Sequence, residues 1–526
     1  MVFLYFLFTF LNIAIPNSNE TLVIENDDEI LEGEYSNFKS QTKTLIISTG
    51  VSKVGENAFY EWSNLTTVQV SDSVSIIGNY SFYHCYNLKT IQIGNNVSSI
   101  GGSAFESCYN LTEVTIPSSV KFIGQWIFYS CSNLYFVVIR GNLETIASGA
   151  FESCISLTNI VIPNSVTTIG SSAFYSCFKL KSITIPNSVT SIEDFTFCDC
   201  ANLETVTIGE KVKTIGDYSF SSCTKLGVII IPNSVTTITS SFVDCISLHQ
   251  VTFGESLKMI GNLAFCCCFK LSKVIIPNSV SYIDDYSFYM CYDLSNLTIG
   301  ENVEKIGEAA FQLCSMLTYV YIPKSVSEIR SNPFVSCQNL QRIEVSSENM
   351  HYANYMNNGI LYDKNILTIV SYPVALKNAT FDIPSSVETI GGYCFYQCTS
   401  LSTIRIGGNV TKISERAFDS CSNLICIYFY GSEVTFGYSP FGSVPAKTVY
   451  VSEQYQGETF DVLPIKKGFQ ECPKSDEKKM SDSLFFFLVI GVPVIAIVGI
   501  VLIIMLFVWI RRKAKGDYID IPSLTQ

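Results

Sequence analysis

Charged residues are scarce in this chain of 526 residues: they make up 15% of it, against 48% for hydrophobic residues. Only 33 residues are Lys or Arg, and the net charge is −13. A protein that grips nucleic acid through its phosphates needs clustered cations. The composition therefore predicts a folded protein without a nucleic-acid partner.

Histidine is scarcer still, with three residues at His84, His249 and His351. None of them has a second His or a Cys pair at the spacing of metal ligands. The sequence also lacks the G-x-x-x-x-G-K-[ST] loop, the G-x-S-x-G elbow and the H-E-x-x-H helix that carry common catalytic chemistries. We therefore expect no catalytic residue, no metal site and no cofactor, and predict that the protein is not an enzyme.

Two long apolar runs lie near the ends of the chain. The first, MVFLYFLFTFLNIAI, precedes the polar segment PNSNE, as the apolar region of a secretory signal does, although no basic residue marks its start. We predict a signal peptide over 1–18, with a buried N-terminal strand as the alternative.

The second run, 484–510, has 27 residues without a charge, which exceeds the ~20 needed to cross a bilayer. It predicts a transmembrane helix over 483–510. Because the basic segment RRKAK follows directly, the positive-inside rule places the tail, 511–526, in the cytoplasm. We expect a single-pass type I protein of the plasma membrane with an extracellular ectodomain.

Cysteine is abundant, with 20 residues, and most of these recur at a fixed period. Each periodic cysteine has Phe three residues before it and Leu three residues after it, then an aliphatic residue at plus six and an apolar one at plus eight. Pro or Gly is usual at plus nine. The steps are 22 or 23 residues, except across one irregular stretch, and the periodic cysteines are Cys85, Cys108, Cys131, Cys154, Cys177, Cys200, Cys223, Cys245, Cys268, Cys291, Cys314, Cys337, Cys398 and Cys421.

The repeated pattern L-x-x-[IV]-x-I has the two-residue period of a strand with one buried face, and the Pro or Gly after it ends the strand in a turn. One unit cannot bury its apolar residues alone, so neighbouring units must stack into a solenoid with a continuous core. We predict a β-rich solenoid of about 15 coils with a 23-residue period over 42–432. Caps are expected at 19–41 and 433–482, and an irregular insertion at about 341–384.

The pattern resembles the BspA-like, or Treponema-type, class of leucine-rich repeat, whose unit carries the frame C-x-x-L-x-x-[IV]-x-[IL]-P…V-x-x-I-G-x-x-A-F. The segment SCISLTNIVIPNSVTTIGSSAF (153–174) shows this frame, and the insertion, with its GILY and YP, also resembles an element of that family. The resemblance implies a leucine-rich-repeat surface protein, for which adhesion to host proteins, host cells or other microbes is the usual proposal.

The periodic cysteines are predicted to be reduced core residues. Buried free Cys packs as a small hydrophobe, and side chains aligned along a ladder do not readily adopt the disulfide dihedral. In the segment AFCCCFK, Cys268 is the periodic residue, whereas Cys266 and Cys267 lie on a variable edge, so we expect no metal there. A bridge from Cys426 to Cys472 is left open.

Strand positions plus five and plus seven should form a continuous exposed surface, and most of its residues are small and polar. Three apolar or aromatic groups differ from this background: Phe136, Val138 and Val161; Val228, Ile230 and Ile275; and Tyr319 with Tyr321. Exposed apolar patches and tyrosines are typical of contact sites, although such residues also suit strands in general. We predict that these groups bind an extracellular protein or glycan ligand.

Sequons of the form N-x-[ST] predict N-glycosylation of the ectodomain. They lie at Asn64, Asn79, Asn96, Asn110, Asn296, Asn378 and Asn409.

The tail segment from Tyr518 to Ile521 resembles the Y-x-x-Φ signal that eukaryotic adaptors recognise in membrane cargo. We therefore predict a type I surface protein that adheres to host or neighbouring cells, and whose tail binds a cytoplasmic adaptor and directs endocytosis. The alternatives are a phagocytic or signalling receptor and a structural surface coat.

Overall fold

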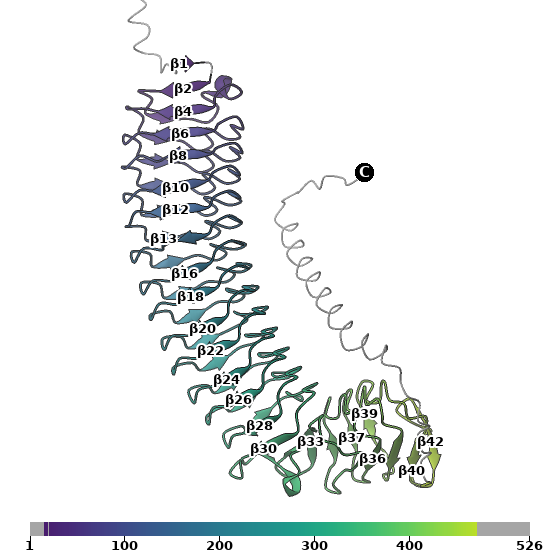
Figure 1. Cartoon of the computed structure of the whole chain (residues 1–526). Coiled ribbons are helices and arrows are strands. Elements are labelled where there is room, and N and C mark those ends of the chain that lie inside the picture. Colours follow the sequence, from purple (N-terminus) through teal and green to yellow (C-terminus); the bar gives the residue numbers. More distant parts are fainter. Residues whose placement is uncertain (1–14, 19, 471–526) are drawn as a thin grey trace, which may run out of the picture. The chain divides into compact units, whose positions relative to one another are not determined.

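The computed structural model describes residues 15–18 and 20–470, which form one stack of short coils (Figure 1). Most coils contribute one strand of two to four residues to a first stack and one two-residue strand to a second stack. The first stack up to the insertion comprises β2 (Thr21–Ile24), β4 (Thr44–Ile47), β6 (Thr67–Val70), β8 (Thr90–Gln92), β10 (Glu113–Ile116), β12 (Phe136–Ile139), β14 (Asn159–Ile160), β16 (Ser182–Thr184), β18 (Thr205–Thr207), β20 (Val228–Ile230), β22 (Gln250–Thr252), β24 (Lys273–Ile275), β26 (Asn296–Thr298), β28 (Tyr319–Ile322) and β30 (Arg342–Val345).

The second stack runs beside the first along the same coils. Its strands are β3 (Glu29–Ile30), β5 (Lys53–Val54), β7 (Ile76–Ile77), β9 (Ser99–Ile100), β11 (Phe122–Ile123), β13 (Thr145–Ile146), β15 (Thr168–Ile169), β17 (Ser191–Ile192), β19 (Thr214–Ile215), β21 (Thr237–Ile238), β23 (Met259–Ile260), β25 (Tyr282–Ile283), β27 (Lys305–Ile306) and β29 (Glu328–Ile329). Pairing in both stacks is parallel, and each residue lies opposite its equivalent in the next repeat, as Glu113 does opposite Phe136. The 23-residue period therefore sets the register.

The core is built from ladders of identical residues. The rings of Phe128 and Phe151 are stacked with centroids 5.5 Å apart, and Phe151 stacks on Phe174 at 5.3 Å. Next to this ladder the thiol of Cys154 donates a hydrogen bond to the Phe128 carbonyl of the preceding coil, at 3.2 Å. The same contact recurs along the stack, so the cysteines pack as small apolar residues that also satisfy a buried carbonyl.

A third side of each coil, here called the turn edge, extends from six residues before the periodic cysteine to one residue after it. Its backbone also forms a ladder: the N–H groups of Ser172, Phe174 and Ser176 bond to carbonyls of the next coil at 2.8–3.0 Å. Ser172 and Ser176 both have a φ of 57°. Alternate residues thus aim their N–H groups along the stack, two of them from the left-handed region, which satisfies backbone groups without a strand.

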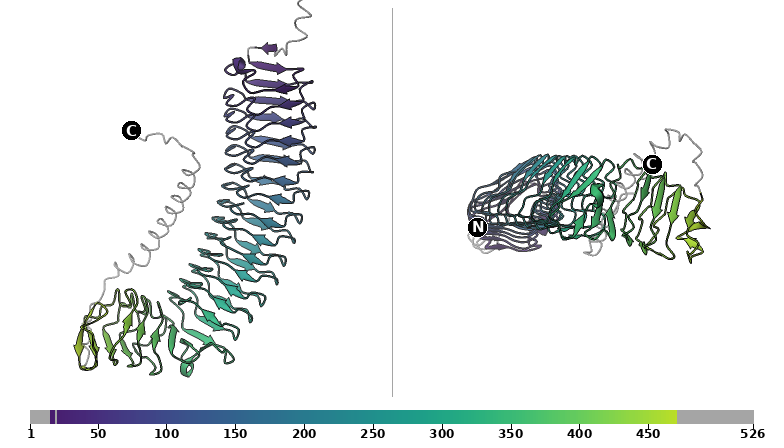
Figure 2. Two further views of the ribbon diagram at one scale, coloured as in Figure 1. Left: turned by 180° about the vertical axis from the view of Figure 1, so that it is seen from behind. Right: turned by 90° about the horizontal axis from the view of Figure 1, so that it is seen from below.

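The irregular insertion folds as a short antiparallel excursion. It contains β31 (Tyr352–Ala353), the 3₁₀ helix η2 (Tyr355–Asn357), β32 (Leu361–Asp363) and β33 (Thr368–Ser371), and β32 pairs antiparallel with both neighbours. Across it, Asn332 donates to the Tyr393 carbonyl at 3.0 Å and Gln338 to Gln397 at 2.7 Å. The turn edges before and after the insertion therefore meet, where Figure 2 shows the stack changing direction.

Two stacks resume after the insertion. Their strands are β34 (Thr380–Asp382), β35 (Thr389–Ile390), β36 (Thr403–Ile406), β37 (Lys412–Ile413), β38 (Cys426–Phe429), β39 (Thr435–Phe436), β40 (Val449–Val451) and β42 (Leu463–Lys467), and β41 (Thr459–Phe460) pairs antiparallel with β42 at the end. At the other end, β1 (Ile15–Ser18) pairs antiparallel with β2, and the 3₁₀ helix η1 spans Ser36–Phe38.

The prediction of a β-rich solenoid with a 23-residue period is confirmed, but the number of coils was underestimated. The structure has about 19 turns rather than about 15. The additional coils lie at the two ends of the stack, with β2 and β4 at one end and β40 and β42 at the other, and directly after the insertion at β34, so not all of them fall outside 42–432. These coils lack the Cys–Phe–Leu frame on which the sequence count was based.

Within 15–18 and 20–470, no helix is long and apolar enough to cross a membrane. The predicted transmembrane helix at 483–510 and the tail with its Tyr518 motif lie outside the described residues. So do residues 1–14 of the predicted signal peptide. These three interpretations stay predictions.

Candidate functional site

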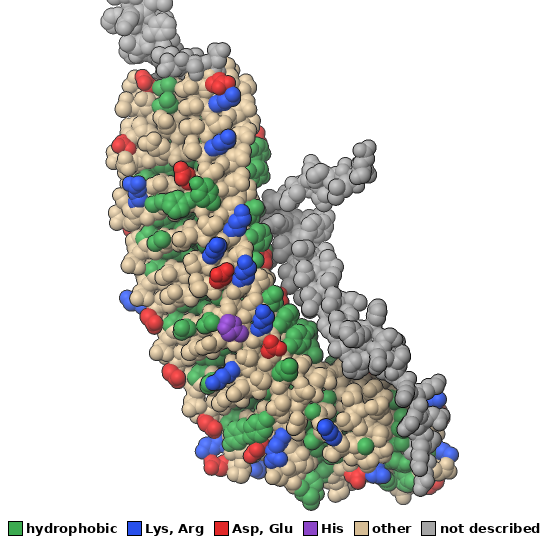
Figure 3. All heavy atoms as spheres, viewed as in Figure 1, with side chains coloured by type: hydrophobic (Ala, Val, Ile, Leu, Met, Phe, Trp, Pro, Cys, Tyr) green, Lys and Arg blue, Asp and Glu red, His purple; other side chains and the backbone are tan. Residues whose placement is uncertain are grey.

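The exposed side of the first stack, here called the outward face, carries the predicted ligand-binding residues. In each strand the side chains alternate: Val137 on β12 is 4% exposed, whereas its neighbour Phe136 is 47% exposed. Figure 3 shows this face, on which hydrophobic side chains form separate patches and charged side chains are scattered between them. The predicted residues are therefore placed where a ligand could reach them.

The first group forms one continuous patch. Phe136 and Val138 lie on β12, and the register of β12 with β14 brings Val161 into line with Val138. Val161 is 74% exposed. Tyr135, directly before β12, is exposed as well; it was not predicted because it falls just before the alternating positions.

The second group is divided. Val228 and Ile230 lie together on β20, and Ile230 is 63% exposed. Ile275 lies on β24, and Thr252 of the intervening strand β22 is opposite Ile230. The second group is therefore two separate apolar sites, on β20 and β24, with Thr252 of β22 between them.

The third group is tied to charged neighbours. Tyr319 and Tyr321 on β28 lie opposite Arg342 and Glu344 of β30. The Tyr319 hydroxyl donates to Glu344 Oε2 at 3.1 Å, and Arg342 Nε lies 3.6 Å from the same oxygen. Burial and this hydrogen bond raise the pKa of Tyr319. The aromatic pair is thus an amphipathic surface with a fixed hydroxyl.

The predicted glycosylation sites differ in their surroundings. The amide groups of Asn64, Asn96 and Asn409 donate to carbonyls of the preceding coil at 2.7–2.8 Å. Asn110 donates to Asn87 at 3.1 Å in a side-chain ladder, and the side-chain oxygen of Asn79 accepts a hydrogen bond from the Gly102 N–H at 2.8 Å. Asn378 is exposed. Asn296 is exposed on β26, so a glycan there would project from the outward face between the second and third groups.

An exposed aromatic surface on the turn edge was not predicted. Tyr60 stacks on Tyr83 with centroids 5.0 Å apart, Tyr83 on His84 at 3.8 Å, and Tyr86 on Tyr109 at 5.3 Å. Burial lowers the pKa of His84. The 23-residue spacing of Tyr60 from Tyr83, and of Tyr86 from Tyr109, was the signal that could have revealed these stacks.

The periodic cysteines are free and buried, as predicted. Burial raises the pKa of the Cys85 thiol to about 12, so these thiols stay protonated and unreactive at neutral pH. Cys426 is in a disulfide. Cys472, to which a bridge was left open, lies outside the described residues. In the described part of the chain, no three His, Cys, Asp or Glu side chains are grouped as metal ligands.

Stacked coils with parallel strands, one continuous core and a long exposed strand face define a leucine-rich-repeat solenoid, a class whose extended surfaces bind other macromolecules. The chain matches the family described as the BspA type leucine rich repeat region (6 copies) over residues 28–157, 144–268, 229–341 and 373–458. It belongs to that family.

Solved structures that resemble the chain are leucine-rich-repeat proteins too. One from Bacteroides ovatus is 22% identical, with a TM-score of 0.49 over 86% of this chain and 97% of that chain. One from T. pallidum is 27% identical, with a TM-score of 0.28 over 41% of this chain and 87% of that chain. The pneumococcal vaccine antigen PcpA is 20% identical, with a TM-score of 0.32 over 74% and 86%. No curated protein matches the chain.

Proposed function

We propose that the protein is a single-pass type I cell-surface protein whose solenoid binds an extracellular protein through the outward face, and that this binding serves adhesion to host or neighbouring cells. The observation that carries the proposal is the set of exposed apolar residues, among them Phe136, Val161 and Ile230, on a face whose other side chains are mostly polar.

Strand propensity does not account for these residues. The equivalent position holds threonine in other coils, as at Thr184 and Thr207, and threonine is also β-branched and suits a strand. Val161 or Ile230 in that position gains nothing for the strand and exposes apolar surface to water, at a cost of about 25 cal/mol per Å². Covering by a partner would remove that cost.

The spacing of the groups favours a protein partner over a single sugar. From β12 to β28 there are eight strand steps, which at ~4.8 Å each span about 38 Å. A standard protein interface buries about 800 Å² on each partner and is of this width. A glycan ligand would engage one group at a time.

Binding of the 20–470 fragment to cells and to extracellular-matrix proteins tests the proposal. The variant Phe136→Thr/Val161→Thr/Ile230→Thr inserts the residue that other coils place at these positions, so it should fold and should lose at least tenfold in affinity. The control is Ile76→Thr on the second stack, where Thr145 and Thr168 fill the equivalent position; it should bind normally. A fragment that binds no cell or protein would favour the structural-coat alternative.

We also propose that the tail recruits a cytoplasmic adaptor through Tyr518 and Ile521 and so directs endocytosis. Both residues lie outside the described part, and the support is the tail sequence alone. Tyr518→Ala/Ile521→Ala should lengthen the residence of the full chain at the cell surface without changing ligand binding. Unchanged uptake would remove the sorting role and leave adhesion, or a receptor that signals by another route.

A further inference from the structure

The cysteine pair that the core ladder does not use lies in a small cluster of its own on the turn edge. Cys266, Cys267, Met290 and Val243 are buried together and form an apolar cluster separate from the main core. Around them pack partly buried side chains, namely Tyr218, Leu263, Phe269, Tyr289, Tyr292 and Leu313. The cluster is thus a sulfur-rich site under an aromatic rim.

Two sulfur–sulfur contacts link three side chains of this cluster. Cys266 Sγ lies 3.4 Å from Cys267 Sγ, and the Cys267 thiol donates to Met290 Sδ at 3.8 Å. Cys267 and Met290 are 23 residues apart, so they occupy the same position in successive coils, with φ values of 61° and 60°. The repeat itself therefore places the thioether beside the thiols.

A disulfide between the two cysteines is disfavoured by backbone geometry. Consecutive Cα atoms are ~3.8 Å apart across a trans peptide, whereas disulfides need at least ~4.4 Å. The pair therefore stays a dithiol, and both sulfur atoms, 3.4 Å apart, remain available as ligands.

We propose that Cys266, Cys267 and Met290 bind one Cu(I) ion. Thiolate and thioether sulfur are soft ligands that select Cu(I). With metal–sulfur bonds of about 2.3 Å, three ligands in a trigonal arrangement have sulfurs about 4 Å apart, so the Cys266–Cys267 and Cys267–Met290 separations each require only a small opening. Zn²⁺, which prefers four nitrogen, carboxylate or cysteine ligands, lacks them here.

Binding of Cu(I) at this site needs no electron donor or acceptor. Each thiol releases its proton to solvent as its bond to copper forms, the thioether sulfur donates a lone pair, and copper stays in the +1 state. The carboxyl group of Asp244 lies beside Cys267 and interacts with its thiol.

Competition for Cu(I) tests the site in the full-length chain, purified under reducing, anaerobic conditions and titrated against bicinchoninate. We expect one tightly bound Cu(I) in the wild type and none in Cys266→Ser/Cys267→Ser. Met290→Leu should weaken binding at least tenfold. X-ray absorption of the loaded wild type should show sulfur ligands only.

The repeat supplies variants that should fold. Ser176 and Leu313 occupy the position of Cys267 and Met290 in other coils, and circular dichroism checks that each variant keeps its strands. The control Cys198→Ser alters a cysteine on the same edge but outside the cluster, and should bind as the wild type does. Equal Cu(I) binding by the wild type and the double serine variant, or nitrogen and oxygen ligands in the absorption spectrum, would overturn the proposal.

Discussion

At the scale of single residues, the periodic cysteine combines two roles, since it fills a small apolar space and its S–H satisfies the carbonyl of the preceding coil. Cys154→Ala removes the sulfur and the hydrogen bond to Phe128 O, and should lower the free energy of unfolding by about 1–2 kcal/mol. Cys154→Ser should lower it further, because the shorter hydroxyl is buried without a good partner. Urea unfolding of the 20–470 fragment measures both, and a serine variant as stable as the wild type would contradict this view.

Two half-buried carboxyl groups on the turn edge make stability depend on pH. Burial raises the pKa of Asp199 and of Asp244 above 3.8, so the folded state holds these protons more tightly than the unfolded state does. The free energy of unfolding should therefore be greatest below the unfolded pKa and fall as pH rises through the folded pKa. Asp199 faces Tyr175 and Ser222, whose hydrogen bonds oppose this shift.

Asp199→Asn/Asp244→Asn tests this linkage. The variant cannot ionise at these positions, so its stability should vary less than that of the wild type as pH rises from about 4, and should exceed it at neutral pH. Thermal unfolding across a pH series, with Asp293→Asn on another coil as a control, measures the difference. Parallel stability curves for variant and wild type would show that the two carboxyls do not contribute.

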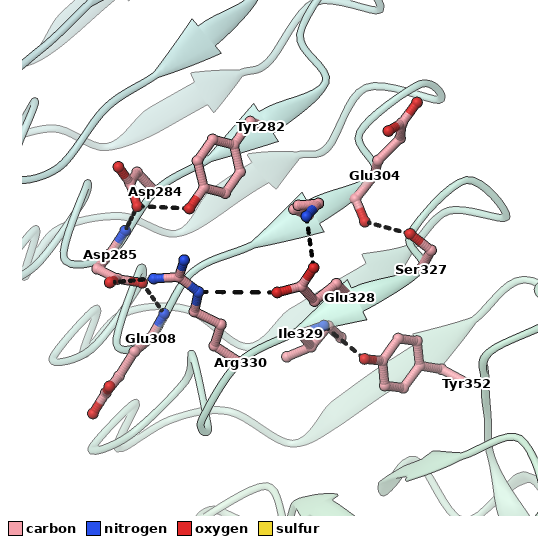
Figure 4. Close-up of polar contacts among 11 residues, drawn as sticks. Tyr282, Asp284, Asp285, Glu304, Glu308, Ser327, Glu328, Ile329, Arg330 and Tyr352 are labelled. Carbon is pink, nitrogen blue, oxygen red and sulfur yellow. Dashed lines mark hydrogen bonds and ion pairs between the residues drawn. The ribbon is translucent and has the colours of Figure 1, made fainter.

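At the scale of elements, the insertion must end the second stack without leaving backbone groups unpaired. In the regular array the N–H of Ile329 would bond to the next parallel strand; here it donates to the hydroxyl of Tyr352 at 2.6 Å (Figure 4). Tyr352 is 9% exposed and comes 23 residues after Ile329, so its side chain occupies the place of the missing strand. Next to it, the guanidinium group of Arg330 lies 2.6 Å from the carboxylate of Asp285. This ion pair links the last coils before the insertion.

Tyr352→Phe should therefore destabilise the junction at the insertion. The ring is kept, but the N–H of Ile329 is left buried without a partner, at a cost of about 1–3 kcal/mol. Hydrogen exchange should show faster exchange at Ile329 than in the wild type, with little change at β7 or β9. The matched control is Tyr282→Phe, whose hydroxyl bonds to Asp284 at the surface. Equal exchange in both variants would contradict the role of Tyr352.

The regular coils could be predicted from sequence because each strand repeats the same alternation with the same spacing, so the period alone sets the register. The end coils could not, since their core uses other residues, among them Phe441, Tyr455 and Phe460. Met290 was missed for a related reason: methionine is common in apolar cores, and only the shared coil position with Cys267 shows that its sulfur lies beside the thiols. The positions of the three groups on the outward face could be predicted from the sequence. The residues of neighbouring strands that contact them could not.

At the scale of the whole molecule, the period makes the distance between binding groups adjustable in steps of one strand. Ser182 lies opposite Thr205, so deletion of residues 182–204 joins equivalent positions and should leave a continuous stack. It brings Phe136 and Ile230 closer by one strand spacing, ~4.8 Å. Thr44 lies opposite Thr67, so deletion of 44–66 removes a coil outside the groups and is the matched control.

If one protein partner contacts the first and second groups at once, deletion of 182–204 should weaken binding at least tenfold, because a shift of ~4.8 Å misaligns two contacts that a rigid partner must make together. Deletion of 44–66 should leave binding unchanged, and both variants should keep the circular dichroism spectrum of the parent fragment. If the two deletions bind alike, the groups act separately, and a repeated small ligand such as a glycan explains the outward face better than a single protein.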